Sequence, residues 1–235
     1  MKQVNYKKFH EIADRWRLLL ASDSVVFSFL NNRLSILLIK RKFAPGVGRW
    51  ALPGGFVREE ESLDDSARRE LQEETGLPDD MYLEQLYTFG RVDRDSRGRV
   101  ISVAYMVLLA EPERVILNAH DDAADAAWWP IEKLPPLAFG VGHREIIDYA
   151  CQRLRWKFEY TNAALSMLPR KFTLSDLQVL YEAVYDRNLD KRNFRKKILL
   201  LDWLKPVAGQ RREFGRPAQL YQARSRKLKY YIKVI

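Results

Sequence analysis

Over the first 150 positions, runs of apolar residues alternate with turn signals in a way that predicts a sheet. Two runs rich in β-branched and aromatic residues, 24–29 and 34–39, flank the pair Asn31 and Asn32, an arrangement typical of a tight hairpin. The runs 82–91 and 100–109 are further strand candidates, joined by a polar turn. We therefore predict two hairpins within this region.

Apolar residues recur at helical spacing in three other segments. Residues 63–75 and 143–160 each have the pattern of a helix. Strands interspersed with helices indicate an α+β module, which we place at residues 21–155. Residues 1–20 are predicted to contain an amphipathic helix docked on this module, with its apolar positions at Phe9, Ile12, Trp16, Leu19 and Leu20.

From about residue 156 the pattern changes. Helical spacing over 172–185 and again over 190–204 is separated by a short polar turn. A turn-rich stretch over 206–223 then predicts a hairpin. Two helices, a tight turn and a hairpin make up the order of a winged helix-turn-helix, which we predict for residues 156–235.

The composition narrows the class of protein. A chain of 235 residues that is 47% apolar and 30% charged can bury a core, so wholesale disorder is excluded. The single cysteine, Cys151, rules out an intrachain disulfide and favours a reducing compartment, and the residue itself is expected to be inert. No run of about 18 apolar residues predicts a membrane span, and no signal peptide is evident. We expect a soluble cytoplasmic protein with no membrane partner.

The net charge of +9 is an average of two unlike halves. Residues 1–150 contain 20 Lys and Arg against 24 Asp and Glu, whereas residues 151–235 contain 20 against 7. A reversal of this size indicates two modules with different partners, and a basic module can attract nucleic acid. A basic tail that only aids solubility is the alternative.

Three carboxylates give the strongest chemical signal. Glu70, Glu73 and Glu74 are spaced i, i+3 and i+4, so a helix places them on one face. Such like charges repel one another unless a hard divalent cation lies among them, and Mg²⁺ accepts carboxylate oxygens together with water and phosphate oxygens. The alternative is a solvated acidic helix without a ligand.

The boundaries of this helix are also marked in the sequence. Ser62 and Asp65 resemble a capping pair, and Gly76 is suited to a C-cap. The apolar positions Leu63, Ala67 and Leu71 step by four along another face and are predicted to pack on the sheet.

This segment resembles the Nudix box, G-x5-E-x7-R-E-U-x-E-E-x-G-U, at every defined position. The resemblance implies an α/β/α Nudix sandwich and hydrolysis of a nucleoside diphosphate linked to another moiety. It also implies that Glu70, Glu73 and Glu74 bind Mg²⁺ or Mn²⁺, that Arg69 orients them, and that the base lies elsewhere, with Glu111, Glu113, Asp121, Asp122 and Asp125 as candidates. The matching residues are Gly55, Glu61, Arg69, Glu70, Leu71, Glu73, Glu74, Gly76 and Leu77.

The second helix of the C-terminal module has a basic face. Asp190 occupies an N-cap position, and Phe194, Ile198 and Leu201 form one apolar stripe. A helix with an apolar stripe and an outward basic face suits the major groove of DNA, although such modules also serve protein contacts. The candidate DNA-binding residues are Lys191, Arg192, Arg195 and Lys196 on the helix and Arg211, Arg212 and Arg216 in the wing.

Taken together, the modules resemble the Nudix-related transcriptional regulators of NAD metabolism. The resemblance rests on the Nudix box followed by the basic helix DKRNFRKKI and a wing that ends in GRPAQLYQ. It implies a homodimer that binds double-stranded operator DNA and senses ADP-ribose or a related nucleotide. Many such regulators have degraded boxes, whereas this box is whole. A working ADP-ribose pyrophosphatase with an accessory C-terminal domain is therefore the alternative.

Candidate nucleotide contacts come from the loops near the box. An aromatic ring and cationic side chains could stack on a base or bind phosphate. Trp50 has core packing as its alternative, and the arginines have a solvated turn as theirs. His143 has no partner at metal-ligand spacing. The candidate ligand-binding residues are Arg49, Trp50, Arg91, Arg97 and Arg99.

Overall fold

The fold is described from a computed structural model, which covers residues 18–78, 81–112, 117, 123–211 and 217–231. The first module is a mixed sheet whose central strands, β1 and β6, run parallel, while the other pairs are antiparallel. The order is β3-β2-β1-β6-β5, and β4 pairs with β1 and β7 with β2. The strands are β1 (Leu19–Leu30), β2 (Arg33–Arg41), β3 (Trp50–Ala51), β4 (Gly54–Phe56), β5 (Tyr82–Phe89), β6 (Val100–Leu109) and β7 (Ala123–Pro130).

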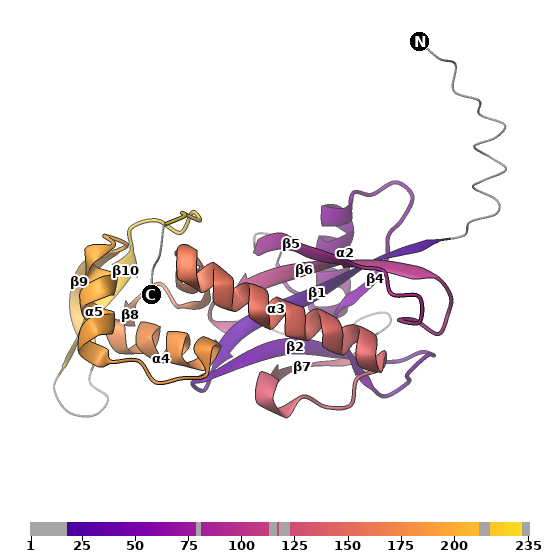
Figure 1. Cartoon of the computed structure of the whole chain (residues 1–235), viewed down its shortest axis with the longest axis horizontal. Helices are drawn as coiled ribbons and strands as arrows, with labels where there is room; N and C mark the ends of the chain where they lie inside the picture. The colour runs from indigo at the N-terminus through magenta and orange to yellow at the C-terminus, as the bar shows by residue number, and fades with distance from the viewer. Residues whose placement is uncertain (1–17, 79–80, 113–116, 118–122, 212–216, 232–235) are drawn as a thin grey trace, which may run out of the picture.

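Helices cover both faces of this sheet because successive side chains of a strand point to opposite faces. On β1, Val25 and Phe27 belong to the core that contains α3 (Gly140–Tyr160), whereas Val26 packs in the cluster that contains Leu71 of α2 (Leu63–Thr75). The predicted packing of α2 through Leu71 is therefore confirmed. In Figure 1, α3 crosses in front of the sheet.

The predicted strands and helices of this module are confirmed, with one correction at its start. Asn31 and Asn32 both adopt positive φ, as a tight hairpin turn requires, and join β1 to β2. The helix predicted within residues 1–20 is wrong at its end, because Leu19 and Leu20 begin β1 and pair with β6. The rest of that predicted helix lies outside the described residues.

The second module has the predicted winged helix-turn-helix arrangement. The predicted helix over 190–204 extends too far, because Leu201 is its C-cap, Asp202 adopts positive φ and a strand begins at Leu204. Its three-stranded sheet has the order β8-β10-β9. The elements are β8 (Phe172–Thr173), α4 (Leu174–Tyr185), α5 (Lys191–Leu200), β9 (Leu204–Arg211) and β10 (Ala218–Ala223).

The two modules share one hydrophobic core, and α3 connects them. α3 continues through residue 155, where the sequence placed the module boundary. Near its C-terminal end, the ring centre of Phe158 lies 5.1 Å from that of Tyr181 on α4. Arg155 Nε donates a hydrogen bond to the Val184 carbonyl at 3.0 Å. Tyr185 Oη donates to the Arg155 carbonyl at 3.2 Å. The winged helix is therefore fixed against α3 by packing and by hydrogen bonds at a helix end.

Within the described residues, no helix is both long enough and apolar enough to cross a bilayer. Cys151 of α3 is partly buried, and burial raises the pKa of its thiol to about 12. The thiolate is the reactive form of cysteine, so this residue has the inert character that the sequence predicted.

Candidate functional site

The carboxylate helix α2 has the predicted boundaries because both ends are capped. The Ser62 hydroxyl accepts a hydrogen bond from the Asp65 amide at 3.2 Å, and Gly76 ends the helix with a φ of 73°. Residues 70, 73 and 74 consequently lie on the face that borders β4 and the loop between β4 and α2. Glu74 is buried, and its Oε2 accepts a hydrogen bond from the Gly54 amide at 2.8 Å.

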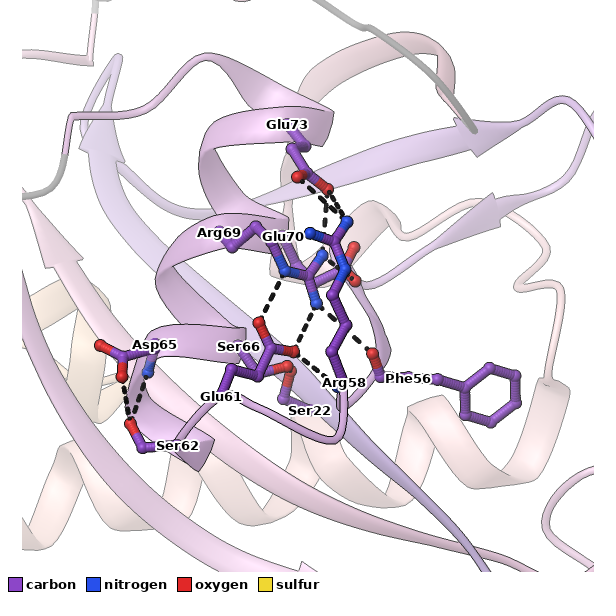
Figure 2. A network of polar contacts seen from close by, with 10 residues as sticks. All are labelled: Ser22, Phe56, Arg58, Glu61, Ser62, Asp65, Ser66, Arg69, Glu70 and Glu73. Atoms are coloured by element: carbon purple, nitrogen blue, oxygen red, sulfur yellow. Dashed lines mark hydrogen bonds and ion pairs between the residues drawn. The ribbon is translucent and has the colours of Figure 1, made fainter.

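Arg69 lies at the centre of the other carboxylates. Its guanidinium binds Glu61 with two hydrogen bonds, at 2.8 and 2.7 Å, and Nη1 also contacts Glu70 at 2.7 Å and Glu73 at 3.0 Å (Figure 2). Arg58 Nη2 also donates a hydrogen bond to Glu73 Oε1 at 3.3 Å. Arg69 therefore orients Glu61, Glu70 and Glu73, of which Glu70 and Glu73 belong to the set that the resemblance implied.

Two carboxyl groups of this network have pKa values that are shifted in opposite directions. Hydrogen bonds from Arg69 hold the pKa of Glu61 at about 2, so this residue stays ionised. Burial raises the pKa of Glu70 above its ordinary value, and Arg69 offsets that effect only in part. Glu70 is therefore a desolvated carboxylate that gains from a further cation.

Two glycines let the loop approach these carboxylates closely. A Cβ atom on Gly54 would come within 2.2 Å of the Ser22 carbonyl oxygen, and one on Gly55 would lie 2.3 Å from Glu70 Oε1. Any side chain at either position would displace backbone or the carboxylate itself. Gly55 thus has a steric reason to be glycine.

The carboxylates of Glu70, Glu73 and Glu74 have the chemistry that a hard cation requires, although other groups of the protein already hold them. Carboxylate oxygens on one face are the ligands that Mg²⁺ accepts. Among the described residues, however, no three His, Cys, Asp or Glu side chains converge closely enough to hold a metal ion. Arg69 holds Glu70 and Glu73, and the Gly54 amide holds Glu74. A bound cation would compete with these contacts.

A cleft of about 130 Å³ opens beside this face of α2. It brings carboxylates of α2 together with cationic and aromatic side chains from β2, from the loop between β5 and β6, and from the start of α3. Opposite charges on facing walls suit a ligand that contains phosphates. Its lining includes Asp23, Arg41, Gly54, Gly55, Phe56, Glu70, Glu74, Arg94, Asp95, Arg97, Phe139 and His143.

Of the five ligand candidates, the structure places Arg97 in this cleft. Its guanidinium lies 4.6 Å from the ring centre of Phe56 and 5.1 Å from that of Phe139, and Asp95 binds it at 2.7 Å. A planar group is therefore held between two aromatic rings at the cleft wall.

The other four candidates do not line the cleft. Trp50 packs edge-on against Trp129 at 5.2 Å, which is the core role given as its alternative. Arg91 pairs with Asp93 at 2.7 Å, and Arg99 donates to the Gly90 carbonyl. Arg49 is solvent-exposed.

The polar floor of the cleft consists of residues that are not among the five ligand candidates. Arg94 is 7% exposed and binds Asp23 at 3.1 Å, while its Nε is buried and makes no hydrogen bond within the described residues. Nδ1 of His143 accepts a hydrogen bond from the Leu52 amide at 3.1 Å. Asp23, Arg94 and His143 come from distant segments, so no local spacing announces them. A buried arginine with an unused hydrogen-bond donor can be recognised only from the tertiary structure.

His143 predicts a specific pH dependence of stability. It is fully buried, and burial lowers its pKa from 6.5 to about 4, although Asp23 raises it in part. Below pH 6.5 the unfolded chain takes up a proton that the folded chain does not, so the free energy of unfolding falls as the pH drops toward 4. The loss from this group at pH 5 is about 2 kcal/mol.

Urea unfolding at pH 7.5 and pH 5 measures this effect. His143→Asn keeps an acceptor for the Leu52 amide but does not titrate. The difference in unfolding free energy between the two pH values should shrink by about 2 kcal/mol in the variant. An equal difference in both proteins would show that the imidazole is not held neutral.

The candidate catalytic bases gain no support from the cleft. Glu111 and Asp125 are not among its lining residues. Asp125 is exposed on β7, where its side chain accepts a hydrogen bond from the Ala126 amide. Glu113, Asp121 and Asp122 lie outside the described residues.

The basic helix α5 has the predicted two-sided character. Asp190 caps it by accepting a hydrogen bond from the Asn193 amide at 2.8 Å. Phe194 and Ile198 are buried, and Phe194 packs edge-on against Tyr181 at 5.4 Å. Lys191, Arg192 and Lys196 are solvent-exposed, whereas Arg195 is partly buried.

The wing candidates are only partly covered by the structure. Arg211, at the end of β9, forms an ion pair with Asp176 in the first turn of α4. Asp176 also completes a capping box with Thr173. Arg212 and Arg216 lie outside the described residues.

Family models agree with this division of the chain. The model described as the NUDIX domain matches residues 21–150, and the model described as the NrtR DNA-binding winged helix domain matches residues 164–223. These matches coincide with the sheet module and the second module.

Three relatives extend the comparison. The ADPR responsive transcriptional repressor NtrR of Acinetobacter baylyi is 34% identical over 87% of this chain and 81% of that protein. An ADP-ribose pyrophosphatase of Methanocaldococcus jannaschii is 41% identical over 61% of this chain and 79% of that protein. Shewanella oneidensis NrtR complexed with a 27mer DNA superposes with a TM-score of 0.77 and 31% identity, covering 92% of this chain and 99% of that one. The NUDIX domain of the same Shewanella protein, complexed with ADP ribose, superposes with a TM-score of 0.56 and 32% identity. This match covers 65% of this chain and 99% of that one.

The chain belongs to the Nudix family and carries an NrtR-type DNA-binding winged helix domain. The α+β fold, with a Nudix sandwich followed by a winged helix, is therefore confirmed.

Proposed function

We propose that this protein is a transcriptional regulator that binds double-stranded operator DNA and responds to ADP-ribose or a related nucleotide, with a link to NAD metabolism. The observation that carries the proposal is the placement of α3. Phe139 and His143, at its N-terminal end, line the cleft, and Arg155 and Phe158, near its C-terminal end, pack on the winged helix. A ligand in the cleft therefore contacts the element that holds the DNA-binding module.

The proposed nucleotide site is the cleft beside α2. Arg41, Arg94 and Arg97 provide positive charge for phosphates, and Phe56 and Phe139 provide aromatic surface. The relatives that respond to, hydrolyse or are complexed with ADP-ribose support this ligand class. Ligand binding changes DNA affinity only if the nucleotide prefers one of two conformations.

The proposed DNA site is α5 with the wing. Lys191, Arg192 and Lys196 are exposed cations on one helix, as major-groove binding requires. The relative complexed with a 27mer DNA supports this partner. A homodimer would present two such helices to half-sites about 34 Å apart. A protein that binds operator DNA acts where that DNA lies, which for a bacterial regulator is the cytoplasm.

Hydrolysis of the bound nucleotide is the second candidate function. The complete Nudix box and the pyrophosphatase relative favour it. Glu70, Glu73 and Glu74 would hold Mg²⁺ or Mn²⁺, which supplies Lewis acidity and a more acidic water when bound. In this chain, Arg69 fixes the positions of Glu61, Glu70 and Glu73. If turnover is retained, the protein destroys its own effector.

A gel shift on the DNA upstream of the chain's own gene tests the proposal directly. We expect a complex in the absence of ligand, and a lower DNA affinity when ADP-ribose is added. Chromatography of the same mixture with and without Mg²⁺ then shows whether AMP and ribose 5-phosphate have formed. A shift that ADP-ribose leaves unchanged would contradict the proposed effector.

A further inference from the structure

A second cleft, of about 190 Å³, lies on the winged helix, away from the nucleotide cleft. Three elements form its walls: the first turn of α4, the middle of α5, and β10 of the wing. The cleft therefore borders α5, the helix that carries the proposed DNA-binding cations. Its lining includes Leu174, Ser175, Arg195, Pro217, Gln219 and Tyr221.

Arg195 differs from the other cations of α5. The exposed residues Lys191, Arg192 and Lys196 project into solvent, whereas Arg195 is partly buried and points back to α4. Its Nη2 donates a hydrogen bond to the Ser175 hydroxyl at 3.2 Å. Its Nε is buried and makes no hydrogen bond within the described residues. Because Nε has no exposed surface, the Nη groups are the part of Arg195 that can meet a ligand in the cleft.

The nearby polar groups leave the cleft positive. The carboxylate of Asp176, in the same turn of α4, is held by Arg211 and by the Thr173 amide, the latter at 2.7 Å. The side-chain amide of Gln219 donates hydrogen bonds to the Val207 and Leu220 carbonyls, each at 2.8 Å. Arg195 and the hydroxyl groups of Ser175 and Tyr221 are among the polar side chains of the described lining that can meet an anion. The start of α4 adds the positive end of a helix dipole.

We propose that this cleft binds one backbone phosphate of duplex DNA and that Arg195 clamps it, separately from the side chains that read base edges. The inference rests on the proposed DNA-binding function. A DNA phosphate is favoured over a free anion because the exposed basic residues Arg192 and Lys196 lie on the same helix. The two Nη groups of a guanidinium can bind two phosphate oxygens at once.

The salt dependence of DNA binding tests this role. Binding constants are measured for an operator duplex and a scrambled duplex at several salt concentrations, with the full chain. For Arg195→Gln we expect about tenfold weaker binding to both duplexes and a salt slope smaller by about 0.9, the value for one lost phosphate contact. Lys133→Gln removes one exposed charge from the Nudix module and should keep the slope of the original protein.

Two further variants separate geometry from charge and folding. Arg195→Lys keeps the charge but cannot bind two oxygens in a fork, so it should restore the slope without restoring the full affinity. Ser175→Ala removes the hydroxyl that positions the guanidinium and should weaken binding to both duplexes equally. Thermal unfolding verifies that each variant is folded at the assay temperature.

The outcomes are distinguishable. An unchanged slope for Arg195→Gln would overturn the phosphate assignment, while DNA binding by the original protein would leave the proposed function intact. A loss confined to the operator would instead make Arg195 a reader of bases and overturn the clamp. Inhibition of binding to both duplexes by millimolar inorganic phosphate alone, at constant ionic strength, would indicate a free-anion site. If the original protein binds neither duplex, the proposed function itself fails.

Discussion

A variant with Arg192→Ala and Lys196→Ala is expected to lose operator binding by about 100-fold or more, because each base or phosphate contact in a groove is worth about 1–3 kcal/mol. Both side chains are exposed on α5. Their removal should leave the fold unchanged, since Phe194 and Ile198 provide the packing of this helix.

A gel shift or fluorescence anisotropy titration with the operator duplex measures this loss. Lys133→Ala combined with Arg144→Ala is the matched control, because it removes two exposed cations from the Nudix module. The control should bind DNA nearly as tightly as the original protein at physiological salt. A gel shift that the α5 variant leaves intact would remove this helix as the reader of the operator.

Replacing Glu73 and Glu74 together by Gln is expected to abolish Mg²⁺-dependent cleavage of ADP-ribose. Gln has the shape of Glu and can still accept the hydrogen bond from the Gly54 amide, but it lacks the charge that binds a hard cation. Loss of the metal removes both the polarisation of the pyrophosphate and the activation of water, so we expect a fall of at least about 1,000-fold in kcat/KM. DNA binding without ligand should be retained.

Chromatography of AMP released at saturating Mg²⁺ gives the rate. Glu59→Gln with Glu60→Gln is the matched control, because both carboxylates are exposed in the loop before α2. Unchanged turnover in the Glu73 and Glu74 variant would contradict the metal assignment. If the original protein forms no product, hydrolysis is excluded, and calorimetry with ADP-ribose and Mg²⁺ tests whether these carboxylates hold a metal for binding alone.

Features that depend on neighbours in sequence were predicted well. The limits of α2 follow from Ser62 and Gly76, which cap the helix through contacts within four residues. Asn31 and Asn32 predicted the β1–β2 turn because their side chains tolerate positive φ. The exposed face of α5 follows from helical periodicity alone.

Features that depend on distant segments were predicted poorly. The sequence showed helical spacing at Leu19 and Leu20, but pairing with β6, about 80 residues away, makes them part of a strand. Arg94 and His143 reach one cleft only because β1, the β5–β6 loop and α3 meet there. The sequence alone predicts an exposed cation at Arg195, yet this side chain donates a hydrogen bond to Ser175 and lines a cleft.

The sequence by itself determined the two modules, the carboxylate face of α2 and the basic face of α5, because capping, periodicity and charge are local properties. The tertiary structure alone decided how these parts meet. It placed Arg69 among three carboxylates, assembled the cleft from distant loops, and joined the cleft to the winged helix through α3. The physical reason is that sheet pairing and core packing bring together side chains whose separation along the chain carries no signal.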